Sequence, residues 1–198
     1  MQLIEGLGVR LRPAGPGDRE RFREILGCPE VARWWGDPEE ETEEACAPPD
    51  GVRSCAIELR PEAGADGTGS PGAADGTGSP GADGAAPLVV GIVQAWEEPT
   101  RDFRHAGMDI AVHPDWHRKG IGGAALYVLA HYLFEVDGHH RLTIDPAADN
   151  EPAISLYRKL GFRPVGVMRE YERRRDGSVR DGLLMDMLAG ELVEPGRH

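Results

Sequence analysis

The sequence predicts a single domain of mixed α/β class, and three observations support that prediction. Residues 108–112 alternate between apolar and polar side chains, which is typical of a half-buried strand. A glycine-rich turn follows directly, and residues 124–134 then place apolar side chains on one face of a helix. The 198 residues, 40% of them hydrophobic, are enough for one domain with a substantial core.

The first part of the chain is expected to hold two strands and two short helices. Residues 9–13 are typical of a first strand. A helix is predicted over 16–26, with proline in its first turn, and residues 30–35 start a second short helix. Residues 52–59 alternate again and predict the second strand.

Residues 61–87 interrupt this pattern. The nonapeptide ADGTGSPGA occupies residues 65–73 and recurs identically at 74–82. Such a segment buries too little apolar surface to offset the entropy of ordering it, and two copies are too few for a solenoid. We therefore expect a disordered loop between two hairpin strands, within one domain that spans residues 1–198.

The second half of the chain alternates strands with two longer helices. The first of these helices opens on the glycine-rich turn. The second begins at Asn150, a capping residue that is followed by proline in the first turn, and Gly161 ends it. The expected strands are 88–96, 105–112, 141–145, 162–168 and 183–188, and the expected helices are 120–135 and 150–160.

The charge of the chain argues against two classes of partner. A formal net charge of −12 repels nucleic acid backbones and anionic membranes, and it attracts a cationic substrate. Solubility alone also accounts for this acidity. Because no apolar run reaches membrane-spanning length and the N-terminus has no signal-peptide pattern, we expect a cytoplasmic protein.

The cysteines and histidines do not predict a metal site. Cys28, Cys46 and Cys55 are odd in number and lack metal-ligand spacing, and the seven histidines form no ligand cluster. We therefore expect unreactive thiols, no disulfide framework and no bound metal.

A strand that feeds a glycine turn at the start of a helix is suited to binding an anion. The main-chain N–H groups of the turn point outward, the helix dipole favours negative charge, and glycine lets a phosphate approach closely. An ordinary strand-to-helix turn that needs glycine would have the same sequence. The residues of this turn are His117, Arg118, Lys119, Gly120, Ile121, Gly122 and Gly123.

The turn resembles the Q/R-x-x-G-x-G/A motif of the GNAT acetyltransferase superfamily, with His117 in place of the usual Gln or Arg. Residues 150–162 resemble a second family pattern, N-x-x-A-I-x-L-Y-x-K-x-G-F, at every fixed position. The two motifs occur in the family's order, separated by one helix and one strand. The resemblance implies the GNAT fold, a mostly antiparallel sheet of six to seven strands that is splayed between the fourth and fifth strands, with helices on both faces.

The resemblance also implies a co-substrate, acetyl-CoA, whose pantetheine arm enters the gap in the sheet. Unpaired main-chain groups at the gap would bond the arm, and the N–H near Val112 would face the thioester carbonyl and stabilise the oxyanion. Asn150 matches an asparagine that bonds the arm, although capping its helix explains it equally well. The residues implied to contact acetyl-CoA are Ile110, Ala111, Val112, Asn150 and the turn from His117 to Gly123.

Acetyl transfer to an amine needs a neutral amine, a stabilised oxyanion and a protonated leaving thiolate. An alkylammonium with a pKa of about 10 is mostly charged at pH 7, and its deprotonation costs about 4 kcal/mol. Asp109 and Asp145 lie on the two strands that flank the expected gap, and a carboxylate takes such a proton directly or through water. Tyr157 matches the family tyrosine that protonates the thiolate, and a core position on the apolar face of its helix also explains it.

A narrower resemblance is to the aminoglycoside 6′-N-acetyltransferases. Trp34 and Trp35 are adjacent and cannot both face one core from a helix, so one of them should line a surface or a cleft. The resemblance implies that tryptophan lines the sugar pocket. It also implies that Asp109 is the base, that Asp145 is a carboxylate for substrate, and that Asp181 is a further acidic position.

Two charged runs bear on this substrate. The acidic residues at 37–44 would steer a polycation toward the pocket, or they form an ordinary solvated face. The arginine run at 173–175 does not fit a pocket for a polycation, because it would repel such a substrate unless it lies in an exposed hairpin.

These observations predict an acetyl-CoA-dependent N-acetyltransferase that acetylates the 6′-amine of an aminoglycoside directly, in a ternary complex. Residues 180–185 also suit the ribosomal-protein acetyltransferases, so a protein N-terminus or another small amine is the alternative substrate. A non-catalytic module that binds acyl-CoA is the third hypothesis, and the presence of Asp109 and Tyr157 argues against it. The expected partner is a small cationic amine, and the chain would act as a monomer or a homodimer.

Overall fold

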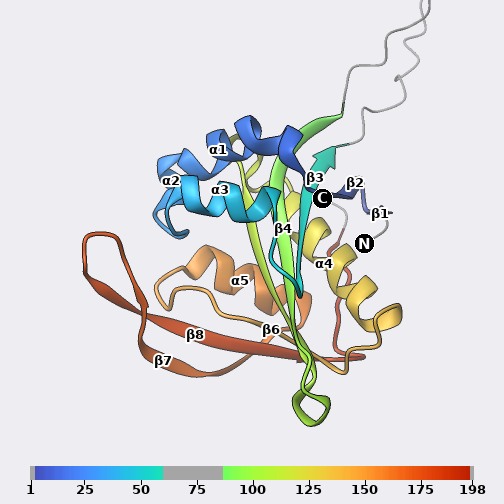
Figure 1. The fold of residues 1–198 in the computed structure, drawn as a ribbon. Coiled ribbons are helices and arrows are strands. Elements are labelled where there is room, and N and C mark those ends of the chain that lie inside the picture. The colour runs from blue at the N-terminus through green and yellow to red at the C-terminus, as the bar shows by residue number, and fades with distance from the viewer. Residues whose placement is uncertain (1–2, 60–86, 197–198) are drawn as a thin grey trace, which may run out of the picture.

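The computed structural model describes residues 3–59 and 87–196. Within these ranges the chain forms one sheet of eight strands with helices on both faces (Figure 1), so the predicted mixed α/β fold is confirmed. The expected repeat loop at 61–87 lies outside the described residues, apart from Pro87. In the described part of the chain, no helix is both long and apolar enough to cross a membrane.

The sheet is antiparallel at every described neighbour pair but one. The spatial order is β1-β2-β3-β4-β5-β6-β8-β7, and β5 and β6 form the parallel pair. The strands are β1 (Ile4–Gly6), β2 (Val9–Pro13), β3 (Val52–Leu59), β4 (Leu88–Glu98), β5 (His105–Val112), β6 (Arg141–Ile144), β7 (Arg163–Arg173) and β8 (Val179–Leu188).

The sequence predicts six to seven strands, and the described residues form eight. The additional strand is β1, which pairs with β2 across a turn where Leu7 and Gly8 have positive φ values of 50° and 81°. A two-residue turn of this kind matches the twist of a hairpin. β1 is three residues long, too short to give a recognisable alternation, and it therefore escapes a prediction based on pattern.

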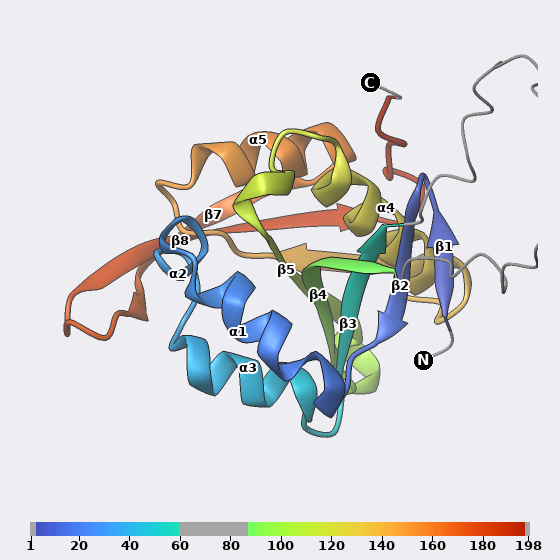
Figure 2. The ribbon, with the colours of Figure 1, turned by 90° about the horizontal axis from the view of Figure 1, so that it is seen from above.

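Two layers of helices cover the sheet (Figure 2). On one face α4 and α5 pack in a single large core, in which Leu129 and Ile154 join Met108 of β5 and Leu142 of β6. On the other face the three N-terminal helices form a second core, where Phe22 packs near Ile92 of β4. The helices are α1 (Arg19–Gly27), α2 (Pro29–Ala32), α3 (Pro38–Cys46), α4 (Ile121–Glu135) and α5 (Glu151–Leu160).

The acidic run at 37–44 forms most of α3, a helix that the sequence analysis did not assign. The Asp37 carboxylate caps it by accepting hydrogen bonds from the N–H groups of Glu39, at 2.8 Å, and Glu40, at 3.3 Å. Acidic residues in the first turn also interact favourably with the helix dipole. The buried residues of α3 are Thr42, Ala45 and Cys46.

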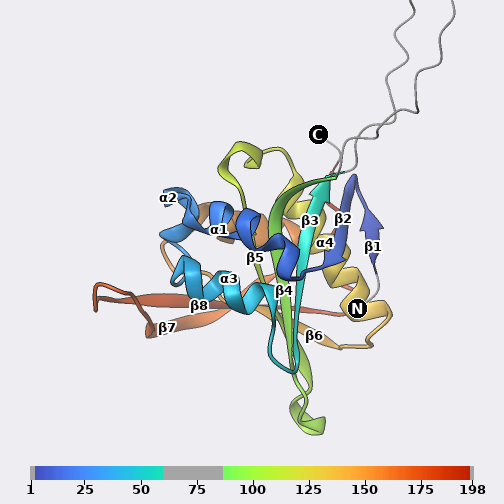
Figure 3. The same cartoon turned by 45° about the horizontal axis from the view of Figure 1, so that its top comes forward.

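β7 and β8 are longer than predicted, and together they form a hairpin that extends beyond the rest of the sheet (Figure 3). Because β7 is the last strand in the order, most of its residues are exposed, and its alternation in the sequence is weak. Arg180 of β8 reaches the segment that follows α2, where it donates to the carbonyl of Arg33 at 2.8 Å. The hairpin therefore brings the C-terminal part of the chain to the N-terminal helices.

The pairing of β5 with β6 ends early, and this confirms the expected splay. Among the described residues the two strands pair at two positions, Ala106 with Leu142 and Gly107 with Thr143. β5 continues to Val112 without further pairing to β6. The edge of β5 that follows Gly107 therefore faces a gap in the sheet.

Replacing Gly161 with alanine should destabilise the fold. Gly161 ends α5 with a φ of 112°, which other residues rarely adopt, and a Cβ there would overlap the carbonyl oxygen of Glu191. Strain of this kind costs about 1–3 kcal/mol, so we expect the free energy of unfolding in urea to fall by about that amount. Gly27→Ala is the matched control, because Gly27 is helical and a Cβ there meets open space. Equal losses in the two variants would contradict the prediction.

Candidate active site

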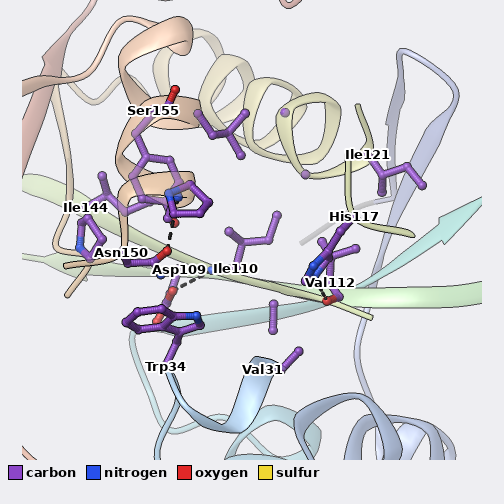
Figure 4. Close-up of a pocket in the computed structure, with 18 of the residues that line it drawn as sticks. Val31, Trp34, Asp109, Ile110, Val112, His117, Ile121, Ile144, Asn150 and Ser155 are labelled. Carbon is purple, nitrogen blue, oxygen red and sulfur yellow. Dashed lines mark hydrogen bonds between the residues drawn. The ribbon is translucent and has the colours of Figure 1, made fainter. Parts of the chain in front are cut away.

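A cavity of about 1890 Å³ opens beside the gap between β5 and β6 (Figure 4). The edge of β5, the turn before α4, part of α5 and the segment after α2 contribute to its walls. The cavity brings together every predicted site residue except Asp181. These residues are Trp34, Trp35, Asp109, Ile110, Ala111, Val112, the turn from His117 to Gly123, Asp145, Asn150 and Tyr157.

The turn before α4 presents main-chain N–H groups to one end of this cavity. Arg118 and Gly120 have positive φ values of 58° and 79°, so the chain bends sharply before the helix begins. The N–H of Ala124 donates to the carbonyl of Gly120 at 2.9 Å, as the first turn of α4 closes. The N–H groups of residues 121–123 precede that bond and, like those at any helix start, have no intrahelical acceptor. This end of the cavity is therefore suited to an anion.

The edge of β5 directs hydrogen-bonding groups into the gap. The N–H of His113 donates to the carbonyl of Val90 on β4 at 2.8 Å. Because the bonding direction alternates along a strand, the N–H groups of Ile110 and Val112 point the other way, toward the gap. The N–H of Ile110 donates to the Asp109 carboxylate at 2.7 Å, so a local side chain satisfies it.

His117, which stands where the resembled motif has Gln or Arg, bonds to the same strand edge. Its Nε2 atom lies 2.7 Å from the carbonyl oxygen of Val112. Because a carbonyl oxygen accepts and never donates, Nε2 carries the proton. His117 thus ties the glycine-rich turn to the end of β5.

Asp109 and Asp145 form an acidic group across the gap. Burial raises the pKa of Asp109 to about 7, and the nearby charge of Asp145 contributes in the same direction. Burial also raises the pKa of Asp145, against the effect of a hydrogen bond from the Tyr171 hydroxyl. That hydrogen bond is the main reason that the pKa of Tyr171 is raised to about 12. A carboxyl with a pKa near 7 accepts and releases protons readily at neutral pH.

Tyr157 belongs both to the core and to the cavity wall. Its side chain is 5% exposed, and its ring packs edge-on against Phe162 with the ring centroids 6.1 Å apart. Burial, followed by the charges of Asp109 and Asp145, raises the pKa of the Tyr157 hydroxyl. The hydroxyl therefore keeps its proton at neutral pH.

Asn150 has the capping role that its sequence position allows. Its side-chain oxygen accepts a hydrogen bond from the N–H of Ala153 at 3.3 Å. The residue also lines the cavity, so a contact with a bound ligand stays a prediction that the geometry permits.

Trp34 and Trp35 both line the cavity and are both half-buried. In Figure 4 the ring of Trp34 lies beside Asp109. The guanidinium of Arg33 lies over that ring, 4.4 Å from its centroid, whereas Trp35 also packs against the second core. An aromatic wall therefore stands next to the acidic group.

Glu41, which the sequence analysis named only as part of the acidic run, lines this end of the cavity, and so do Tyr171, Glu172 and Arg180, which it did not assign to the site. Glu41 lies on α3, and burial raises its pKa. Its signal in the sequence was Asp37 followed by Pro38, a helix-start pattern that places Glu41 in the first turn. The other three residues lie on β7 and β8, where no comparable pattern marks them.

Asp181 is not among the described residues that line the cavity. Its carboxylate accepts a hydrogen bond from the N–H of Glu170 at 2.8 Å. Glu170 has a φ of 51°, and the register of β7 against β8 shifts around it. Asp181 therefore stabilises an irregularity in β7 next to Tyr171, which in turn bonds to Asp145.

Asp109→Asn should stabilise the fold above pH 7 and leave it nearly unchanged near pH 4. The carboxyl titrates near pH 3.9 in an unfolded chain and at about 7 in the folded one. Between these values the folded chain holds a proton that the unfolded chain has released, so stability falls as the pH rises, and the loss is complete above about pH 7. Asparagine keeps the oxygen that accepts the Ile110 N–H and carries no charge.

Thermal unfolding of wild type and variant at about pH 4.5 and about pH 8 measures this difference. We expect the Tm gain of Asp109→Asn to appear at the higher pH, by about 2–4 °C for each kcal/mol gained. Asp149→Asn, at an exposed position, is the matched control. A gain of the same size at both pH values would refute a raised pKa for Asp109.

The comparisons with known proteins agree with this geometry. A family model described as "Acetyltransferase (GNAT) family" matches residues 28–162. The [ribosomal protein bS18]-alanine N-acetyltransferase of Escherichia coli K12 is 37% identical over 79 residues, which are 39% of this chain and 51% of that protein. An N-alpha-acetyltransferase of Sulfurisphaera tokodaii is 39% identical over 64 residues, 32% of this chain and 38% of that protein. The chain thus matches about half, or less, of the length of these curated relatives.

A solved structure has a similar fold over nearly the whole chain. It is the spermidine N-acetyltransferase of Vibrio cholerae in complex with CoA and spermine, with a TM-score of 0.69 and 19% sequence identity. The similarity covers 93% of this chain and 97% of that one. At this level of identity the likeness concerns the fold alone.

Proposed function

The chain belongs to the GNAT family of acetyltransferases, and on that premise we propose that it transfers the acetyl group of acetyl-CoA to an amine of a small polycation. One observation carries the proposal. A single cavity joins an anion-binding turn to a group of carboxyl side chains, and the open edge of β5 lies between them. The acceptor that the sequence favours is an aminoglycoside, acetylated at its 6′-amine.

The end of the cavity at the turn before α4, called the donor end below, fits acetyl-CoA. The main-chain N–H groups of residues 118–123 suit its pyrophosphate. The edge of β5 suits its amide-bearing arm, because an extended chain bonds to an open strand edge as another strand would. When bound, acetyl-CoA supplies the acetyl group as a reactive thioester. The N–H of Val112 points into the gap and is the donor available to the thioester oxygen.

The end of the cavity with the carboxyl side chains, called the acceptor end below, supplies the groups for proton transfer. Asp109 has a pKa of about 7, so its carboxylate is present at neutral pH to take a proton from the attacking ammonium. Tyr157, whose pKa is raised, holds the proton that the leaving thiolate needs. In this proposal the acetyl group passes directly from donor to acceptor in a ternary complex.

The substrate that competes with an aminoglycoside is a protein N-terminus. It is supported by the partial matches to enzymes named for N-terminal or ribosomal-protein acetylation. An α-amine has a pKa of about 7.7–8.0, so it needs less help from a base than an alkylammonium does. A module that binds acyl-CoA without catalysis is the remaining alternative.

A substrate panel separates these proposals. The full chain is incubated with acetyl-CoA and, in turn, kanamycin, spermidine and a peptide that begins with alanine, while thiol release is followed. We expect release with kanamycin, and mass spectrometry and NMR then locate the acetyl group on the 6′-nitrogen. Release with the peptide alone would favour the N-terminal substrate, and no release with any amine would refute the enzymatic proposal.

Tyr157→Phe should lower turnover and leave the affinity for acetyl-CoA nearly unchanged. The phenyl ring keeps the packing against Phe162, but the proton donor is lost, and such a donor contributes about 100-fold or more to a rate. Steady-state kinetics give kcat, and calorimetric titration with CoA gives Kd. Tyr127→Phe on α4 is the matched control, at a tyrosine that does not line the described cavity. Unchanged turnover in Tyr157→Phe would reject the proposed role.

A further inference from the structure

Arg180 connects two segments of the cavity wall that lie far apart in the sequence. It is 8% exposed and stands opposite Glu172 in the register of β8 against β7. Its Nε donates to the Glu172 carboxylate at 2.6 Å. Its Nη1 donates to the carbonyl of Arg33 at 2.8 Å, and its Nη2 donates to the carbonyl of Trp34 at 2.9 Å. The last bond joins residues 146 positions apart.

The two carbonyls that Arg180 binds lie just beyond the end of α2. The last carbonyls of a helix have no intrahelical donor, and α2 is only four residues long, so its own hydrogen bonds hold the following segment weakly. A guanidinium at this point donates hydrogen bonds to both carbonyls, and its positive charge interacts favourably with the negative end of the helix dipole. Through these two hydrogen bonds, the Arg180 side chain connects the main chain at Trp34 to the β7–β8 hairpin.

The guanidinium group of Arg180 also lies close to the Trp34 ring. The guanidinium carbon of Arg180 lies 5.5 Å from the ring centroid, and that of Arg33 lies 4.4 Å from it. A cation over an indole ring within about 6 Å is attracted by it. Arg180 therefore contacts both the main chain and the ring of a residue that lies beside Asp109 (Figure 4).

The ion pair between Arg180 and Glu172 also affects the charge at the acceptor end of the cavity. Arg180 pairs with Glu172, so the positive charge that it brings to the cavity wall is accompanied by a negative one. Asp109, Asp145 and Glu41 also line this end of the described cavity, and burial raises the pKa of each. A buried arginine can therefore line a cavity for a polycation without opposing its binding.

A second link joins the same two segments at the surface. Arg175 contacts the Asp37 carboxylate at 2.7 Å, and the Arg175 side chain is 73% exposed. Exposed ion pairs contribute little, because water and salt screen them. The pair offers a matched control for Arg180, since it ties the same hairpin to the same N-terminal region.

We propose that Arg180 is a positioning residue for the acceptor substrate: it fixes the segment of residues 33–35 over the acidic group, and thereby sets acceptor affinity. The inference rests on the proposed function. It assigns Arg180 no contact with the reacting atoms. The donor end lies on other elements, so acetyl-CoA binding is independent of it.

The test compares Arg180→Lys with wild type and with Arg175→Gln. Lysine keeps the charge but lacks the planar fork that reaches a carboxylate and two carbonyls together. Losing hydrogen bonds to a charged group costs enough to raise the KM for the acceptor about tenfold or more. We expect kcat and the Kd for CoA to change by less than about twofold, and Arg175→Gln to resemble wild type. Amide exchange of residues 33–37 should be faster in Arg180→Lys.

Arg180→Gln serves as a second variant if the lysine variant unfolds, which circular dichroism reports. If the wild-type chain acetylates an amine, and Arg180→Lys matches it in the KM for the acceptor and in amide exchange, the inference is overturned and the proposed function is not. An equal rise in the KM for acceptor and for acetyl-CoA also overturns it, because a general structural defect would act in this way. A wild-type chain that acetylates no amine overturns the proposed function, and the inference with it.

Discussion

The site depends on the early end of the hydrogen-bonded ladder between β5 and β6. After Gly107 the two strands no longer pair, and the sheet gives up main-chain hydrogen bonds that a continuous ladder would make. Local side chains replace some of them, since Asp109 accepts from Ile110 and His117 donates to Val112. The large core beneath the gap joins residues of both strands, so packing holds the two parts of the sheet together.

The gap also explains why the chemical groups gather where they do. Strands that diverge leave room for a cavity, and their side chains and the N-terminal part of α5 form its wall. Asp109 and Asp145 then share a poorly hydrated space with Tyr157, and each raises the pKa of that tyrosine. Burial acts on all three groups in the same direction, toward the neutral form. The raised pKa values of these three groups therefore arise from where the fold places them.

Local patterns allowed most of the fold, including the glycine-rich turn at one end of the cavity, to be predicted. The glycine-rich turn and the capped helix that ends at Gly161 are specified by residues close together in sequence, and both formed as expected. β1 was missed because three residues give no period, and α3 because its acidic residues concealed a cap and three buried positions. The role of Asp181 was not visible either, since a carboxylate that bonds a neighbouring strand has the same sequence as one that faces a ligand.

The acceptor end was harder to predict for a different reason. Its wall includes Arg180, whose partners are 146 and 147 residues away, and no spacing rule reports such a contact. Tyr171 reaches Asp145 from a strand whose register shifts nearby, and a shift of this kind changes which side chains face inward.

The turn before α4 lines the cavity with peptide groups that suit an anion, whereas the opposite end is lined by side chains from several parts of the chain. Peptide groups are common to nearly all residues, so a mutation outside the glycines of the turn seldom alters the first kind of contact, but any substitution among the side chains alters the second. Over evolutionary time, the amine that such a protein accepts can therefore diverge quickly while its requirement for the acyl donor persists.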